Sequence, residues 1–258
     1  MKSNMHNIIR KQYVKLLIIF LILCISFGCS RSNNDDTSGR GSISSYTKIS
    51  TNYYCTDSGL YIDAYKIIYE TIGTDGSTIQ TASGALLIPK LSSGNPTTTE
   101  PFLYLHGTIT QRSDAPSQSS DNLYPGYLIA CNNFITIMPD YLGLGDDTTQ
   151  MHPYHHASST LTATIDMIRA SETFLGTEYS IDMDTNLYIT GFSQGGYATM
   201  IAHKGIQEEY DSEYTVTASF PSSGAYDLSG TMLDLALTST EPMIDTDDTF
   251  GDQLGIYY

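Results

Sequence analysis

The chain has 258 residues, of which 40% are hydrophobic and 16% are charged. This balance is typical of one globular domain with a substantial core, and it excludes a disordered or fibrous protein. The formal net charge is −16. A surface of this sign repels phosphate backbones, so the composition also argues against nucleic-acid binding.

Residues 1–28 are predicted to be a secretory signal. Basic residues precede the apolar stretch "LLIIFLILCISFG", which is too short for a convincing membrane span. Cys29 follows a small residue at the end of this stretch, as in a bacterial lipobox, where the cysteine is lipidated and becomes the new N-terminus. We expect a lipid-anchored protein of the bacterial cell envelope, on the outer membrane or cell surface, or a secreted protein. An ordinary cleaved signal and an uncleaved anchor are the alternatives.

Residues 29–46 are expected to form a flexible tether, because they are polar and rich in Ser, Asn and Gly. Loss of residues 1–28 removes four basic and no acidic residues, which changes the net charge from −16 to −20. Residues 47–258 form the expected domain. It contains Cys55 and Cys131, which an oxidising compartment would allow to pair, although two buried free thiols fit the spacing equally well.

The domain alternates expected strands with expected helices. Residues 59–71 alternate polar and apolar positions, and after the turn "GTDGS" residues 84–90 continue the pattern, which predicts a hairpin. Short apolar strands are predicted at 101–107, 134–141, 186–191 and 215–221, and helices at 121–133, 158–175 and 194–210. Ser158 or Ser159 is the expected cap of the second helix. This order predicts an α/β fold with a mainly parallel sheet, helices on both faces, and ligands at the carboxyl ends of the strands.

The motif "GFSQG" lies where an apolar strand changes directly into a helix. The turn is so tight that side chains at Gly191 and Gly195 would collide with the neighbouring strand and helix, and it leaves Ser193 exposed at the apex. This context favours Ser193 as a catalytic nucleophile over a structural serine-rich turn. The backbone N–H of Gln194, at the helix N-terminus, can stabilise an oxyanion.

The segment "YLHGT" ends an earlier apolar strand. In α/β hydrolases this position supplies the other half of the oxyanion hole, so the expected donor is the backbone N–H of Thr108, with Gly107 permitting close approach. In α/β hydrolases the catalytic histidine follows the nucleophile in the chain. His106 precedes Ser193, and we therefore interpret it as structural.

A specific resemblance extends over residues 47–240. "TASGALLIP", "YLHGT", "MPDYLGLGDD", "HPYHHASS", "ITGFSQGGYATM" and "SGAYDLSGTM" occur in the order seen in bacterial α/β hydrolases that are similar to secretory lipases, of the lipase A type. The resemblance implies an esterase or lipase with a Ser-His-Asp triad, acting through an acyl-enzyme on a small-molecule ester or lipid. It leaves the natural ester open.

The partners of Ser193 in such a triad should follow it in the chain, the acid first and the histidine last. The only histidine after Ser193 is His203, roughly 15 Å along the helix that leaves the turn. Asp227 is a weak candidate for the acid. We therefore expect an α/β-hydrolase domain that is incomplete at its C-terminus and lacks the last strands, so that residues 30–258 alone are poorly soluble and unreactive. Should the chain react, an upstream base would be implied, with His106 and His152 tested first.

No metal or other cofactor is expected. "MHPYHH" carries His152, His155 and His156 near Asp146 and Asp147, but Pro153 interrupts the segment and the resemblance explains it as a structural loop. The acidic "DTDDTFGD" lacks the spacing of a calcium loop. Two other functions remain open. One is a binding lipoprotein or inactive truncated hydrolase that keeps the fold without a working triad, and the other is a serine peptidase on the same fold.

Overall fold

The computed structural model describes residues 39–92, 94–232, 234 and 238. The expected signal segment, the lipid-bearing Cys29 and the acidic stretch near the C-terminus lie outside these residues. Within the described part, no helix combines the length and the apolar character needed to cross a membrane.

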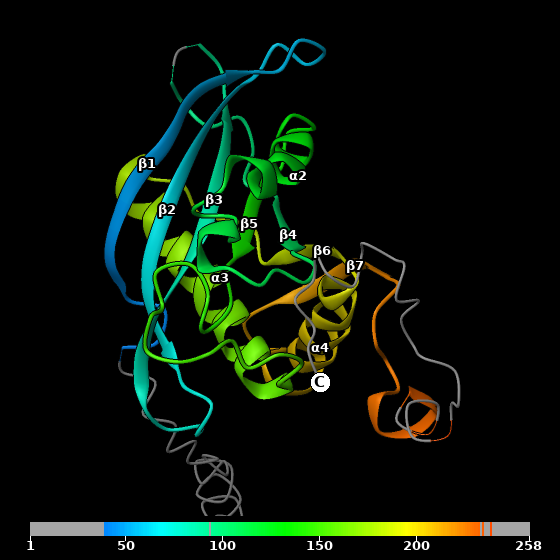
Figure 1. Ribbon diagram of the computed structural model, residues 1–258. Coiled ribbons are helices and arrows are strands. Elements are labelled where there is room, and N and C mark those ends of the chain that lie inside the picture. The colour runs from blue at the N-terminus through cyan, green and yellow to red at the C-terminus, as the bar shows by residue number, and fades with distance from the viewer. Residues whose placement is uncertain (1–38, 93, 233, 235–237, 239–258) are drawn as a thin grey trace, which may run out of the picture. The chain divides into compact units, whose positions relative to one another are not determined.

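The described residues build one seven-stranded sheet in the order β1-β2-β3-β5-β4-β6-β7. The pairs β1–β2, β2–β3 and β3–β5 are antiparallel, whereas the pairs β5–β4, β4–β6 and β6–β7 are parallel. Their bounds are β1 Ile43–Tyr54, β2 Tyr61–Ile72, β3 Ile79–Lys90, β4 Pro101–Leu105, β5 Ile135–Pro139, β6 Asn186–Phe192 and β7 Thr215–Ser222. The expected hairpin and the α/β architecture are both confirmed (Figure 1).

Helices cover both faces of this sheet, as predicted. The long helices α3 (Ala157–Tyr179) and α4 (Gln194–Glu209) pack together over one face, and α2 (Ser120–Ala130) covers the other (Figure 1). Strand β2 serves both cores because successive side chains point to opposite faces. Tyr65, Ile67 and Tyr69 join the core under α3 and α4, and Ile62 and Ala64 join the core under α2. The described residues also form two short helical segments, η1 (Arg112–Asp114) and η2 (Leu228–Met232).

The boundary predicted between the tether and the domain is wrong. Strand β1 begins at Ile43, and the backbone already pairs with β2 at Gly41, whose N–H donates to the carbonyl oxygen of Glu70 at 2.8 Å. The strand was not recognised because it lies at the sheet edge, where most of its side chains are exposed and the apolar alternation is lost. Residues 43–46 therefore belong to the sheet.

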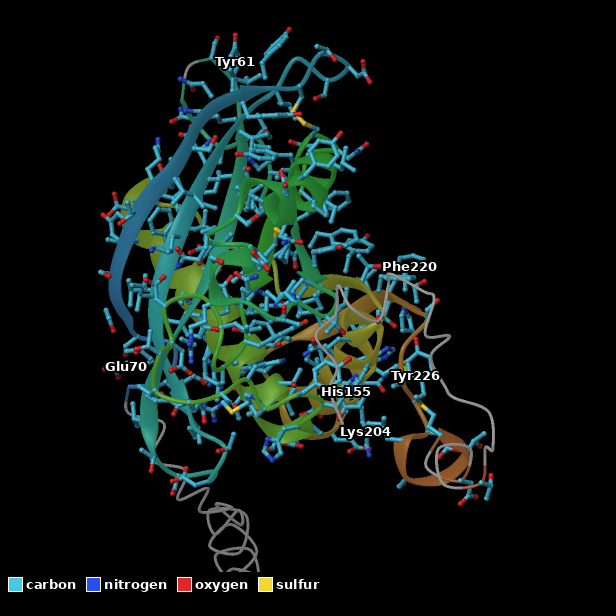
Figure 2. The ribbon with its side chains drawn as sticks, viewed as in Figure 1. Tyr61, Glu70, His155, Lys204, Phe220 and Tyr226 are labelled. Atoms are coloured by element: carbon cyan, nitrogen blue, oxygen red, sulfur yellow. A yellow bond between two sulfur atoms is a disulfide. The ribbon has the colours of Figure 1, made fainter. Side chains whose placement is uncertain are left out.

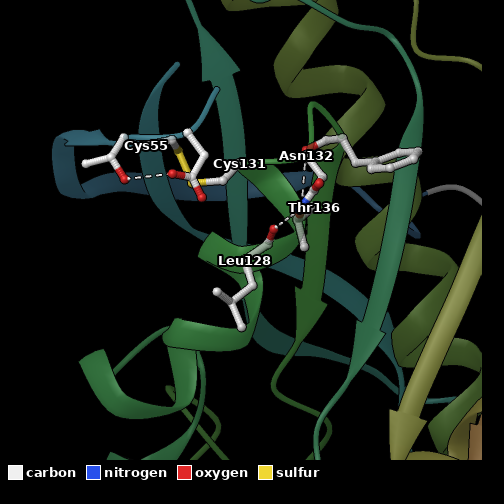
Figure 3. The surroundings of a disulfide bond; sticks show 8 residues. Cys55, Leu128, Cys131, Asn132 and Thr136 are labelled. Carbon is white, nitrogen blue, oxygen red and sulfur yellow. Dashed lines mark hydrogen bonds between the residues drawn. A yellow bond between two sulfur atoms is a disulfide. The ribbon is translucent and has the colours of Figure 1, made fainter. Parts of the chain in front are cut away.

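A disulfide joins Cys55 to Cys131, with their Cα atoms 5.6 Å apart (Figure 3). Cys55 begins the turn between β1 and β2, and Cys131 caps the end of α2. Beside it, the Asn132 amide donates to the carbonyl oxygen of Leu128 at 2.8 Å. The bond resolves the alternative that the spacing left open, and it fastens the edge strand to a helix on the sheet face.

Candidate active site

Ser193 stands at the turn between β6 and α4 with φ 56° and ψ −118°. This positive φ is a region that L-residues with a Cβ rarely occupy, and it persists only where the surroundings hold it. Part of the constraint is a hydrogen bond from the Ser193 N–H to the carbonyl oxygen of Ser222 on β7, at 2.9 Å. The serine therefore sits, half-buried, in a strained turn at the carboxyl edge of the parallel strands.

The glycines around this turn have no space for a side chain. A Cβ at Gly191 would lie 2.3 Å from the carbonyl oxygen of Gly195, and one at Gly195 only 1.9 Å from the carbonyl oxygen of Leu105. The predicted collisions with helix and neighbouring strand are thus confirmed. Gly196 is equally restricted, because its Cβ would lie 2.3 Å from the carbonyl oxygen of Ser222. Helix α4 can approach β4 and β7 this closely only because all three positions are glycine.

Strand β4 brings Gly107 and Thr108 beside the serine. Leu105 pairs with Gly191 across the parallel strands, and a Cβ at Gly107 would lie 3.2 Å from the Phe192 carbonyl oxygen and 3.9 Å from Ser193 Cβ. Among the described residues, no group accepts a hydrogen bond from the backbone N–H of Thr108 or of Gln194. Two unpaired donors are therefore available near one serine hydroxyl.

His106 is buried below this point. Its Nδ1 lies 2.7 Å from the carbonyl oxygen of Gly107 and its Nε2 3.2 Å from that of Asp140, while the ring packs on Tyr141 with centroids 4.3 Å apart. Burial lowers the pKa of His106 below its ordinary value. These contacts agree with the structural role expected for it.

His152 contacts the side chain of Gln194, a pairing that sequence reasoning missed. His152 Nδ1 donates to the carbonyl oxygen of Leu142 at 2.8 Å, so its Nε2 is free to accept from the Gln194 amide nitrogen, 2.6 Å away. Burial lowers the pKa of His152 and so favours the neutral ring. The two residues are 42 positions apart, so only the folded path of the loop before α3 could reveal the contact.

The two groups considered after Ser193 both face elsewhere. His203 Nδ1 lies 2.8 Å from Ser219 Oγ on β7. Asp227 accepts from the Thr231 N–H and hydroxyl at 2.9 and 2.8 Å, and these bonds lower its pKa. Within the described part of the chain, no histidine forms a hydrogen bond with the Ser193 hydroxyl.

The histidines of "MHPYHH" turn toward different partners. His155 lies beside α4, where its ring contacts Tyr154 and Tyr197 with centroids 4.0 and 4.6 Å away (Figure 2). His156 is the cap of α3, since its side chain accepts from the Ser159 N–H. The prediction that Ser158 or Ser159 provides this cap is therefore wrong. Over residues 39–92 and 94–232, no three His, Cys, Asp or Glu side chains gather in a metal-binding cluster.

A cavity of about 700 Å³ opens beside Thr108. Its walls come from the segment after β4 and from the loop between β5 and α3, and Tyr154 connects the two by a contact of 2.8 Å between its hydroxyl and Thr108 Oγ1. The lining residues are Thr108, Ile109, Thr110, Gln111, Arg112, Ser113, Gly143, Leu144, Met151, His152 and Tyr154. The serine turn, the two unpaired donors and the cavity thus occupy one edge of the sheet.

The sheet order and the strand–serine–helix turn together define an α/β-hydrolase fold. The chain is similar to the solved structure of the rice cell wall degrading esterase LipA from Xanthomonas oryzae, with 28% identity, a TM-score of 0.66, and coverage of 76% of this chain and 53% of that one. It is also similar to a protein from Legionella pneumophila assigned as a hydrolase, with 29% identity, a TM-score of 0.60, and coverage of 70% and 52%.

These comparisons support a lipase-like α/β-hydrolase fold for the chain. It spans about half the length of the two solved structures. No protein-family model matches the sequence, and no curated protein does.

Proposed function

We propose that this protein is a serine carboxylic-ester hydrolase with Ser193 as its nucleophile. The observation that carries the proposal is the backbone of Ser193, held at φ 56° between β6 and α4. A strained turn of this kind destabilises the fold, and it persists where function benefits from it. Here it presents a hydroxyl at the carboxyl edge of the sheet, next to unpaired backbone donors.

In the proposed reaction the Ser193 hydroxyl oxygen attacks the ester carbonyl carbon while a base takes the hydroxyl proton. The carbonyl oxygen becomes an oxyanion, which the backbone N–H groups of Thr108 and Gln194 stabilise, assisted by the positive end of the α4 dipole. The base returns this proton to the departing oxygen, which leaves as the alcohol. Water then hydrolyses the acyl-enzyme, which releases the acid and regenerates the Ser193 hydroxyl. The contact between His152 and the Gln194 side chain supports the placement of one of these two donors.

The proposed substrate is a small-molecule ester or lipid. The similarity to an esterase at 28% identity supports this class, and the cavity beside Thr108, of about 700 Å³, has the size of a small-ligand pocket. Degradation of the rice cell wall is a property of the Xanthomonas enzyme.

A fluorophosphonate probe tests the nucleophile in the protein expressed from its intact gene. We expect stoichiometric labelling at Ser193, and loss of both labelling and 4-nitrophenyl ester hydrolysis in the Ser193→Ala variant. Ser158→Ala is the matched control, because Ser158 is exposed at the start of α3 and its loss should leave labelling unchanged. Substantial ester turnover by a folded Ser193→Ala protein would reject the assignment.

We also propose that Cys29 carries lipid and anchors the protein to the bacterial cell envelope. The apolar segment before Cys29 supports this, as does the disulfide at Cys55, a bond typical of oxidising compartments. Metabolic labelling with an alkyne fatty acid should mark the parent and miss a Cys29→Ser variant. Equal labelling of the two would overturn the proposal.

A further inference from the structure

Arg112 is the exception among the cationic side chains. The structure describes seven lysines and arginines, and six of them lie within 4.0 Å of a carboxylate oxygen. The six are Arg40, Lys48, Lys66, Lys90, Arg169 and Lys204. In a chain with 28 acidic and 12 basic residues, a cation with no carboxylate partner in the described part is unexpected.

Backbone groups hold the Arg112 guanidinium in place instead. Its Nε donates to the carbonyl oxygen of Asp147 and its Nη2 to that of Gln150, both at 2.8 Å. The Asp147 carboxylate is engaged elsewhere, since it accepts from the Gly143 N–H at 2.7 Å and from Thr149. The positive charge is therefore oriented but not neutralised by these contacts.

Arg112 lines the same cavity as Thr108. Nη1 donates to no described residue, which leaves it and part of Nη2 able to bind a further acceptor. A planar guanidinium with adjacent N–H groups matches the two oxygens of a carboxylate. The rest of the acidic surface would repel such a ligand, so Arg112 provides a local point of attraction.

We infer that the substrate is an ester that also bears a free carboxylate, and that Arg112 binds this carboxylate in the cavity. This rests on the proposed function and names its substrate class. Arg112 touches the charged end of the substrate and not the reacting carbonyl, so it determines specificity. The reaction remains a hydrolysis: one ester bond breaks, water supplies the hydroxyl and the proton, and the carboxylate group is unchanged.

Two matched pairs of esters test the inference in the protein expressed from its intact gene. In the first pair the charge lies on the acyl side, with mono-4-nitrophenyl glutarate compared with 4-nitrophenyl pentanoate. In the second it lies on the alcohol side, with 3-acetoxybenzoate compared with phenyl acetate. We expect the parent to prefer the carboxylate member of at least one pair. Arg112→Gln should lower kcat/KM for that member by about 10- to 100-fold and leave its neutral partner within about twofold.

Lys204→Gln is the matched control, because Lys204 is an exposed cation on α4 that pairs with Glu208 and is not among the residues that line the cavity. This substitution removes the same charge and should leave kcat/KM for both members of each pair within about twofold of the parent. If Arg112→Gln lowers kcat/KM equally for both members of a pair, Arg112 only holds residues 147–150 in place, and the inference is overturned. No preference in the parent, or a preference that survives Arg112→Gln, would also overturn it.

If the parent hydrolyses none of the four esters, the proposed function fails and binding decides the inference. Calorimetric titration of the Ser193→Ala protein with 3-acetoxybenzoate should then show binding that Arg112→Gln weakens by about 10-fold or more. Absence of binding, or binding unchanged by Arg112→Gln, would refute the role of Arg112.

Discussion

Removal of the disulfide between Cys55 and Cys131 should destabilise the domain strongly. The cysteines are 76 residues apart in the chain, and the entropy of closing a loop of that length corresponds to about 4.5 kcal/mol at 25 °C. For a domain of about 200 residues this shift should lower Tm by about 10 °C. The effect arises mainly in the unfolded chain, which gains freedom when the link is absent.

The assay is thermal unfolding of the Cys55→Ala, Cys131→Ala double variant beside the parent, each with and without a thiol reductant. The reduced parent should unfold near the temperature of the double variant, because both lack the covalent link, and the reductant should leave the double variant unchanged. A difference in Tm below about 3 °C between oxidised parent and variant would refute the reasoning. A parent Tm that does not change when the reductant is added would also refute it.

Three further predictions concern the serine turn and the buried histidines. Ser193→Gly should be more stable than Ser193→Ala by about 1 kcal/mol in urea unfolding, because glycine adopts the positive φ without strain; equal stability would contradict the strain. Gly195→Ala should lower the free energy of unfolding by about 1–3 kcal/mol and abolish fluorophosphonate labelling, since the new Cβ would overlap the Leu105 carbonyl oxygen. Burial lowers the pKa of His106, His152 and His155, so the folded protein binds fewer protons than the unfolded chain below about pH 6.5, and the free energy of unfolding should fall as the pH drops from 7.5 to 6. A flat profile would contradict this.

The lower limit of that pH window follows from Asp140. Burial raises its pKa to about 6, despite hydrogen bonds from Ser117 and Ser83. Between about pH 4 and 6 the folded protein therefore binds an extra proton at this carboxyl, which makes stability rise as the pH falls. Asp140 and the histidines act in opposite directions there, and the contribution of Asp140 fades as the pH rises above 6, so the upper part of the range reports mainly on the histidines.

The sequence predicted the parallel strands and their helices closely, because each forms a short apolar run or a helical stripe. The predicted strand at 186–191 corresponds to Asn186–Phe192, and the predicted helix at 194–210 to Gln194–Glu209. The crowding at Gly191 and Gly195 also followed from the motif, since a tight strand-to-helix turn has a single steric solution. Edge strand β1 was missed because both of its faces are largely polar.

Contacts that depend on the path of the loop between β5 and α3 could not be predicted. This loop brings His152 to the Gln194 side chain and Tyr154 to the Thr108 hydroxyl. It also fixes the Arg112 guanidinium by two backbone carbonyl oxygens, which carry no side-chain signal at all. Pairing of residues through loop backbone depends on tertiary geometry, and no periodicity in the sequence encodes it.

The disulfide and the serine turn lie at opposite ends of the parallel strands. Cys131 precedes the amino end of β5, whereas Ser193 and Thr108 follow the carboxyl ends of β6 and β4. Under the proposed function, substitutions that change which ester is accepted can therefore accumulate in the loops at one end, while the disulfide at the other end preserves resistance to heat. For directed evolution, a variant stabilised by substitutions near Cys55 would be a suitable parent, because it could tolerate destabilising substitutions around the cavity.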